Sequence, residues 1–192
     1  FSASKVEIED YAKKKPLQRA VQLIKMRRNV YFNEDPDNAP TSIILTTLAA
    51  QFYDGQASIS ETFEGIITSI QNHIQTYYPN SPFELPNPVN PEENLADIWE
   101  EKPELYAHFI DFINKLGKEW EELKKTHGIE EEAELIKGMF GDYPYIKAME
   151  AKAKSVNDKR GYGLGILPAT GVMIGHPTEK SLPVKPNNFY GD

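Results

Sequence analysis

The chain has 192 residues, 40% of them hydrophobic, with 29 acidic against 21 basic side chains and a formal net charge of -8. That length and apolar content suit one domain with its own core, and the negative charge argues against binding duplex nucleic acid, which depends on Lys and Arg against phosphate. No run of about 20 apolar residues predicts a membrane-spanning helix, and the absence of cysteine excludes disulfides and thiolate metal sites and is compatible with a cytoplasmic location.

The basic and acidic residues are unevenly distributed. Residues 11–28 carry Lys and Arg but no acid, whereas 92–134 is strongly acidic. A local basic face on an acidic protein suits a small anionic ligand, although the lysines at 13–15 are equally explained as a solvated run before a helix. The chain begins without methionine and without an apolar signal-peptide core, which predicts a fragment of a longer protein and not a secretory leader.

Three helices are predicted in the first eighty residues. Pro16 fits a first helical position, and apolar residues at helical spacing extend that helix to residue 32. Thr41 or Ser42 is expected to cap a second helix that is apolar nearly all round and therefore belongs in the centre of the domain. Ser58, with Glu61 three residues later, has the spacing of a capping box and opens a third helix.

The middle of the chain is rich in prolines, which limit where helices can form. Five of them between 79 and 91 forbid regular helix there. Residues 90–93, with Asn-Pro followed by two acids, predict the start of a short helix that reaches Trp99. Pro103 opens the longest helix, whose aromatic and aliphatic stripe is expected to be core, and shorter helices are expected at about 130–138 and 144–156.

The composition changes near residue 160. Residues 161–192 hold half of the glycines and four prolines. We therefore predict a mainly α fold, with a bundle-like helical lobe over 1–160 and an extended Gly/Pro-rich tail over 161–192, packed on or beside the helices. Short strands are expected in that tail near 164–167 and 172–174.

No self-contained catalytic motif is present. The four histidines are scattered without metal-ligand spacing, and each is expected to be a surface or hydrogen-bonded residue. Residues 161–165 (GYGLG) lack the third glycine and the following helix of a dinucleotide-binding loop. No Gly-Ser turn precedes paired carboxylates, which two-metal nucleotidyl transfer requires. We therefore assign no catalytic and no metal-binding residue to this chain.

Three blocks in order nevertheless resemble one enzyme superfamily. Residues 17–25 (LQRAVQLIK) follow its LxRxVxLxK helix, and 42–50 (SIILTTLAA) follow the helix that opens on a small polar residue. Residues 87–96 with Trp99 are similar to its DPADPxxN segment, and 188–191 (NFYG) to an HTFYG-type ending. The chain thus resembles the C-terminal helical lobe of the oligoadenylate synthetase and cyclic GMP-AMP synthase superfamily, in its bacterial cGAS/DncV-like branch.

The resemblance implies a function for the complete protein. Members use Mg²⁺ to join nucleoside triphosphates into a cyclic di- or trinucleotide second messenger in antiphage signalling. The metal and the catalytic carboxylates belong to an N-terminal lobe, so this chain alone is expected to be inactive. Here Lys25 would contact the donor triphosphate and Ser42 the donor phosphates and base. Ile43 stands where relatives often place a stacking aromatic ring, so base stacking is not expected from it.

The implied partners are nucleoside triphosphates, the N-terminal lobe of the same protein and a regulatory protein bound through the tail, with no membrane and no duplex nucleic acid. Lys25 could instead carry its charge out to solvent along an apolar face. An alternative of another class is a non-enzymatic helical module that senses a ligand or binds a protein partner through its acidic surface. A third possibility is joining of the C-terminus to targets by a ubiquitin-transfer-like partner, which the ending in Asp192 disfavours.

Overall fold

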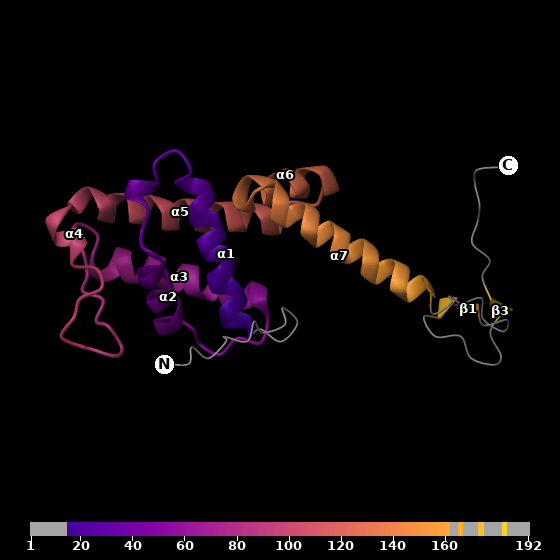
Figure 1. The fold of residues 1–192 in the computed structure, drawn as a ribbon, viewed down its shortest axis with the longest axis horizontal. Coiled ribbons are helices and arrows are strands. Elements are labelled where there is room, and N and C mark those ends of the chain that lie inside the picture. The colour runs from indigo at the N-terminus through magenta and orange to yellow at the C-terminus, as the bar shows by residue number, and fades with distance from the viewer. Residues whose placement is uncertain (1–14, 162–164, 167–172, 175–181, 184–192) are drawn as a thin grey trace, which may run out of the picture. The chain divides into compact units, whose positions relative to one another are not determined.

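A computed structural model describes residues 15–161, 165–166, 173–174 and 182–183. The chain divides into two compact units, residues 1–142 and 143–192. The predicted mainly helical fold is confirmed (Figure 1). The helices are α1 (Pro16–Tyr31), α2 (Ser42–Gln51), α3 (Ile59–Tyr77), α4 (Ile98–Glu101), α5 (Pro103–Lys125), α6 (Ile129–Phe140) and α7 (Asp142–Gly161), with a 3-10 turn, η2, at Pro36–Asn38.

Helix α1 is the centre of the first unit. It packs against α2, α3, α5 and α6, while α3 and α5 lie side by side (Figure 1). Pro16 occupies the first turn of α1, as predicted, and the backbone N–H of Lys15 donates to Gln18 Oε1 at 2.9 Å. Because α1 touches so many neighbours, polar side chains along it face different surroundings at different positions.

The hydrophobic core is built mainly from α3 and α5. Phe63, Phe109 and Phe112 are each 0% exposed. Trp99 of α4 closes one end of this core, with its ring 4.8 Å from that of Phe109. Trp120, expected in the same stripe, is only half-buried and packs 4.6 Å from the ring of Phe63. Helix α2 is more exposed at its start than predicted, because Ser42 and Ile43 are exposed and its buried residues begin at Ile44.

The predicted helix start at 90–93 is wrong. These residues form a turn, and α4 begins only at Ile98, with the Asp97 carboxylate accepting from the Ile98 N–H. The reason is Asn94, which pairs with Pro86 across an isolated bridge. Its side-chain oxygen accepts the backbone N–H groups of Leu85 at 2.9 Å and Ala96 at 3.0 Å. The proline-rich segment is therefore an ordered loop tied to itself.

The second unit holds most of α7 and a small antiparallel sheet of order β2-β1-β3. The strands are β1 (Gly165–Ile166), β2 (Met173–Ile174) and β3 (Leu182–Pro183), with Gly165 opposite Ile174 on one side and Pro183 on the other. The first two fall where short strands were predicted. The NFYG ending and the docking of the tail lie outside the described residues. Helix extends to Gly161 while the compact units divide after Asp142, so the predicted boundary at 160 stays a prediction.

Candidate functional site on helices α1 and α2

Lys25 lies half-buried on the middle of α1. Its neighbour Ile24 is 2% exposed and faces the core. Among the described residues, no hydrogen bond or ion pair holds the Lys25 ammonium. The side chain is thus a cation whose stem is partly covered and whose charge has no protein partner in the described part of the chain. This arrangement fits both an anion contact and a lysine that reaches solvent.

Ser42 is the first helical residue of α2, and Thr41, the other of the two expected caps, precedes it at the cap position. The backbone of Thr41 is extended, with φ -65° and ψ 154°, and its side chain makes no capping hydrogen bond. The first backbone N–H groups of a helix have no partner within the helix. Since no side chain caps them within the described structure, the amides at the start of α2 are open to an anionic group.

Arg28 joins the two helices at this point. Its Nη1 donates to Ser42 Oγ at 3.2 Å and to the carbonyl of Pro40 at 3.1 Å. Arg28 follows Lys25 by three residues, and residues three apart on a helix are neighbours on one face. The structure therefore brings Arg28 of α1 together with Ser42 of α2. We call Lys25, Arg28, Ser42 and Ile43 the α1–α2 face.

Ile43 completes the α1–α2 face with apolar surface. Its side chain is 52% exposed, although it is a large aliphatic residue at the start of an otherwise buried helix. Ser42, before it, is also exposed. A hydroxyl and a methyl-rich side chain therefore lie side by side in sequence at the accessible end of α2.

A hollow of about 360 Å³ adjoins the α1–α2 face. It lies between the end of α1 and the turn that leads to α2, and its walls include Arg28, Asn29, Phe32, Pro40 and Thr41. Neither Lys25 nor Ser42 is among its walls. The hollow offers a guanidinium, a carboxamide and an aromatic edge, but Lys25 lies outside it.

Arg27 has a different environment from its neighbour Arg28. Its guanidinium forms two hydrogen bonds to the Glu119 carboxylate on α5, Nε to Oε2 at 2.7 Å and Nη2 to Oε1 at 2.9 Å. The side chains of Arg27 and Glu119 are only 6% and 14% exposed. The Arg27–Glu119 ion pair is therefore buried between α1 and α5.

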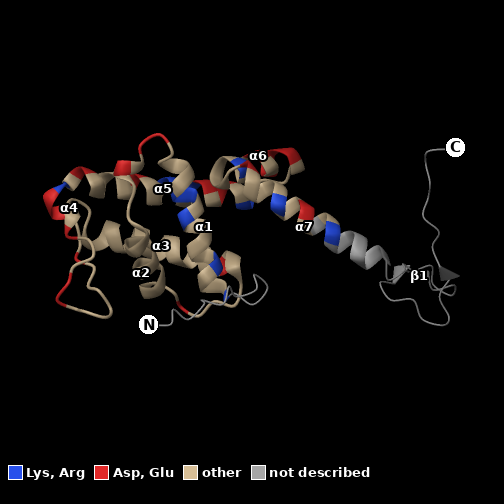
Figure 2. Ribbon diagram, viewed as in Figure 1, with Lys and Arg blue, Asp and Glu red and all other residues tan. Residues whose placement is uncertain are grey.

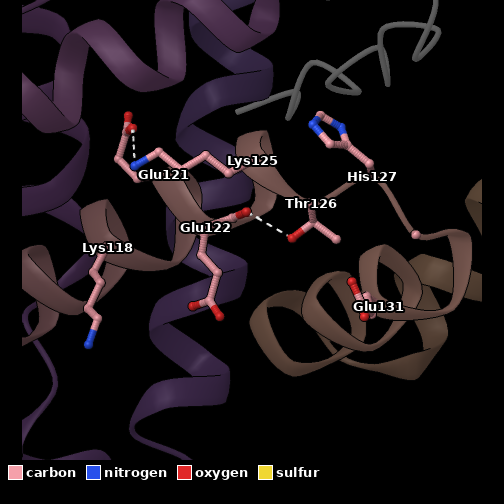
Figure 3. A pocket seen from close by; sticks show the side chains of 8 residues that line it. Lys118, Glu121, Glu122, Lys125, Thr126, His127 and Glu131 are labelled. Atoms are coloured by element: carbon pink, nitrogen blue, oxygen red, sulfur yellow. Dashed lines mark hydrogen bonds and ion pairs between the residues drawn. The ribbon is translucent and has the colours of Figure 1, made fainter.

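A larger hollow, of about 710 Å³, lies where α5 ends and α6 begins (Figure 3). Its walls carry Glu121, Glu122 and Glu131 beside Lys125 and His127. Lys125 lies 3.7 Å from the Glu121 carboxylate, and a hydrogen bond from Lys124 holds the pKa of Glu121 below its usual value. Three carboxylates therefore line this hollow, and Lys125 already faces one of them, so it is a poor site for a phosphate-rich ligand.

The distribution of charge also favours the α1–α2 face for an anion. Figure 2 shows Asp and Glu around α4 and on α6, whereas α1 contains only basic charged residues. Within the described structure, no group of three or more His, Cys, Asp or Glu side chains is placed to hold a metal ion. No described helix combines the length and the apolar character needed to cross a bilayer.

His73, expected to be a surface or hydrogen-bonded residue, lies half-buried among aromatic side chains. Its ring packs among the rings of Phe52, Tyr77, Tyr78 and Phe83 at centroid distances of 5.2 to 5.5 Å. An imidazole enclosed by aromatic rings in this way is part of a packed cluster. The α1–α2 face therefore remains the place where described residues combine cations, open amides and a hydroxyl.

Comparison with known proteins places this geometry in context. The whole chain is 77% identical, over 192 residues, to a protein of Roseivirga ehrenbergii named c-di-GMP synthase. The chain spans 51% of that relative's length. No protein-family model matches the chain.

Among solved structures, the fold is similar to that of the CD-NTase CdnG of Bradyrhizobium diazoefficiens, determined in complex with GTP. The TM-score is 0.59 at 22% identity, over 73% of this chain and 40% of that one. At that identity the likeness concerns the fold. The match covers less than half of that longer chain.

Proposed function

We propose that the chain belongs to the cGAS/DncV-like nucleotidyltransferases and is the helical lobe that holds the donor nucleoside triphosphate in a cyclic dinucleotide synthase. The observation that carries the proposal is the 77% identity to the c-di-GMP synthase of Roseivirga ehrenbergii along the whole chain. At that level of identity we propose the same product, made from two GTP molecules. The catalytic carboxylates lie in the rest of the protein, which this chain does not contain.

The α1–α2 face supplies the donor contacts in this proposal. Lys25 places a compact positive charge against the triphosphate. Ser42 donates its hydroxyl to a phosphate oxygen, and the open amides at the start of α2 add backbone donors to the same anion. Ile43, exposed beside Ser42, offers an aliphatic surface to the base. It supplies van der Waals contact and not ring stacking, so base discrimination has to come from hydrogen bonds elsewhere.

Mg²⁺ belongs to the proposal only through the rest of the protein. The described residues offer no cluster of three metal-ligating side chains, so no step is assigned to a metal on this chain. When bound in a catalytic lobe, Mg²⁺ would neutralise triphosphate charge and activate the attacking ribose hydroxyl. A cytoplasmic location, a role in antiphage signalling and a regulatory protein bound through the tail remain predictions from the sequence.

The test is product analysis with the complete protein encoded by the gene. Purified protein is incubated with Mg²⁺ and GTP, alone and with the other nucleoside triphosphates, and the products are identified by liquid chromatography and mass spectrometry. We expect c-di-GMP. If no mixture of triphosphates yields a cyclic or linear oligonucleotide, the enzyme proposal is wrong and the non-enzymatic helical module replaces it.

Variants at the site test the residue assignments separately from the family assignment. Lys25→Ala should raise the KM for GTP by about tenfold, the loss that removal of one charged contact of about 1.4 kcal/mol produces. Lys102→Ala is the matched control, since it removes one positive charge from an exposed position at the start of α5. Equal kinetics for the two variants would show that Lys25 does not contact the donor, even if the product is c-di-GMP.

A further inference from the structure

We propose that Arg28 is a positioning residue for the donor nucleotide, which holds the Ser42 hydroxyl so that its proton is presented to the donor phosphates. This inference rests on the proposed function and deepens it. It adds a residue that neither the motif pattern nor the resemblance had placed at the site. The role is one of orientation, because Arg28 acts through Ser42.

The guanidinium of Arg28 is held at two edges. On its own helix, Nε and Nη2 both donate to Asn29 Oδ1, at 3.0 and 2.7 Å. On the other side, Nη1 donates to the Pro40 carbonyl at 3.1 Å and to Ser42 Oγ at 3.2 Å. A guanidinium is planar and its donors have a fixed geometry. Asn29 therefore fixes the orientation of the guanidinium plane, which in turn fixes the position of Ser42 and of the first turn of α2.

The direction of the hydrogen bond at Ser42 decides what the hydroxyl can do. A serine hydroxyl has one proton to donate and two lone pairs that accept. Arg28 has no lone pair to offer, so it can only donate, and it occupies a lone pair of Oγ. Among the described residues, no acceptor is recorded for the hydroxyl proton. Ser42 is thus left as a donor, which is what a contact with an acceptor-only phosphate oxygen requires.

The charge of Arg28 supports an anionic ligand. Arg27, next to it, has its charge balanced by the Glu119 carboxylate. The recorded partners of Arg28 are all neutral: an amide oxygen, a backbone carbonyl and a hydroxyl. Its positive charge therefore adds to the partial positive charge of the amides at the start of α2 and to Lys25 three residues before it. A bound triphosphate would supply the counter-charge that this part of the described structure lacks.

A purely structural role makes a different prediction. If Arg28 only fastens α1 to the turn before α2, its loss should lower stability and should not depend on whether Ser42 has a hydroxyl. If it positions that hydroxyl, the losses at the two residues should not add, because removing either one ends the same contact. The dependence of one variant on the other is therefore the informative measurement.

The experiment is a double-mutant cycle in the complete protein with Arg28→Ala, Ser42→Ala and the combined variant. Equilibrium dialysis gives the Kd for a non-reacting GTP analogue, and initial rates with GTP give KM and kcat. We expect each single variant to weaken binding about tenfold, the combined variant to be no weaker than the worse single one, and kcat to stay within about twofold. Arg28→Lys, which keeps the charge but not the fork of donors, should lie between the parent and Arg28→Ala.

Two comparisons guard the result. Lys102→Ala controls for the loss of one positive charge. Asn29→Ala removes the acceptor that fixes the orientation of the Arg28 guanidinium and keeps the charge, so it should weaken binding by a smaller factor, about threefold. This variant also tests the role of Arg28 if Arg28→Ala does not fold. Additive losses of affinity in the cycle would refute the role of Arg28 and leave the proposed donor site in place. The same conclusion would follow if the Arg28 and Asn29 variants matched Lys102→Ala while Ser42→Ala lost affinity. Unchanged affinity in Ser42→Ala overturns the donor site and this inference with it.

Discussion

The buried ion pair between Arg27 and Glu119 allows a test of what holds α1 in place. The two side chains join through two hydrogen bonds of 2.7 and 2.9 Å between α1 and α5. Removing one partner of a buried pair typically costs about 3–5 kcal/mol, because the other charge is left in a medium that solvates it poorly. The effect of each substitution depends on what remains beside the surviving charge.

The surroundings of the two charges differ. In Arg27→Met, Glu119 keeps Lys115 at 3.6 Å and is 14% exposed, so the cost should be near about 3 kcal/mol. In Glu119→Leu, the ring of Tyr31, 5.2 Å from the guanidinium carbon of Arg27, is the recorded partner that remains among the described residues, so the cost should be about 5 kcal/mol. The double variant leaves no buried charge unpaired, since Lys115 is exposed, and should return to within about 1 kcal/mol of the parent.

Urea unfolding of the 192-residue chain, followed by circular dichroism, measures these differences. The control is Lys147→Ala, which breaks an exposed pair with Glu150 at 2.9 Å and should leave the midpoint of urea unfolding almost unchanged. If either single variant of the buried pair behaves like Lys147→Ala, or if the double variant is as unstable as the sum of the singles, the pair does not have the role assigned to it.

Three further predictions concern local contacts. Burial, and secondarily the nearby Tyr78, raises the pKa of Tyr106 to about 12. The folded state therefore keeps a proton that the unfolded state releases near pH 10, so this contribution to stability is full below pH 10 and is lost towards pH 12. Tyr106→Phe should cost about 1 kcal/mol at neutral pH, and its difference from the parent in urea unfolding should shrink over that range; a constant difference would contradict the assigned pKa. Asn94→Ala should cost about 2–3 kcal/mol in the same assay, since its side chain accepts two backbone N–H groups, and a change below about 0.5 kcal/mol would show that the loop does not depend on it. Ser58→Ala should cost about 1 kcal/mol through a lost helix cap whereas Thr41→Ala should cost almost nothing, and equal costs would be inconsistent with the two cap geometries.

The helix starts could be predicted where the signal is local. Pro16 and Pro103 fix the backbone of a first turn, and Ser58 accepts the Glu61 N–H at 3.1 Å as its spacing indicated. The helix expected from residue 90 failed because its start signal is equally a turn signal. The deciding partner, the backbone N–H of Leu85, lies nine residues from the Asn94 side chain that accepts it, and only the folded chain brings them together.

At the candidate site, the positions of the α1 arginines likewise could not be predicted from the sequence. Helix α1 has apolar residues in several directions, since it packs on four helices, so its pattern does not reveal which basic residue enters the core. The structure buries Arg27 against Glu119 and directs Arg28 to Ser42. The spacing of Lys25 and Arg28 was a usable signal that both share one face. Lys25 and Ser42 themselves were proposed from the resemblance, because no chemical motif in the chain would have singled them out.

The most direct test of the central claim, that the α1–α2 face holds the donor nucleotide, is photolabelling of the complete protein with 8-azido-GTP. The labelled protein is digested, and the modified peptides are identified by mass spectrometry, with excess unmodified GTP as the competitor. The account predicts a label that GTP displaces within residues 16–53, with Ile43 as the position nearest the base. A label displaced by GTP that falls only outside these residues would contradict it.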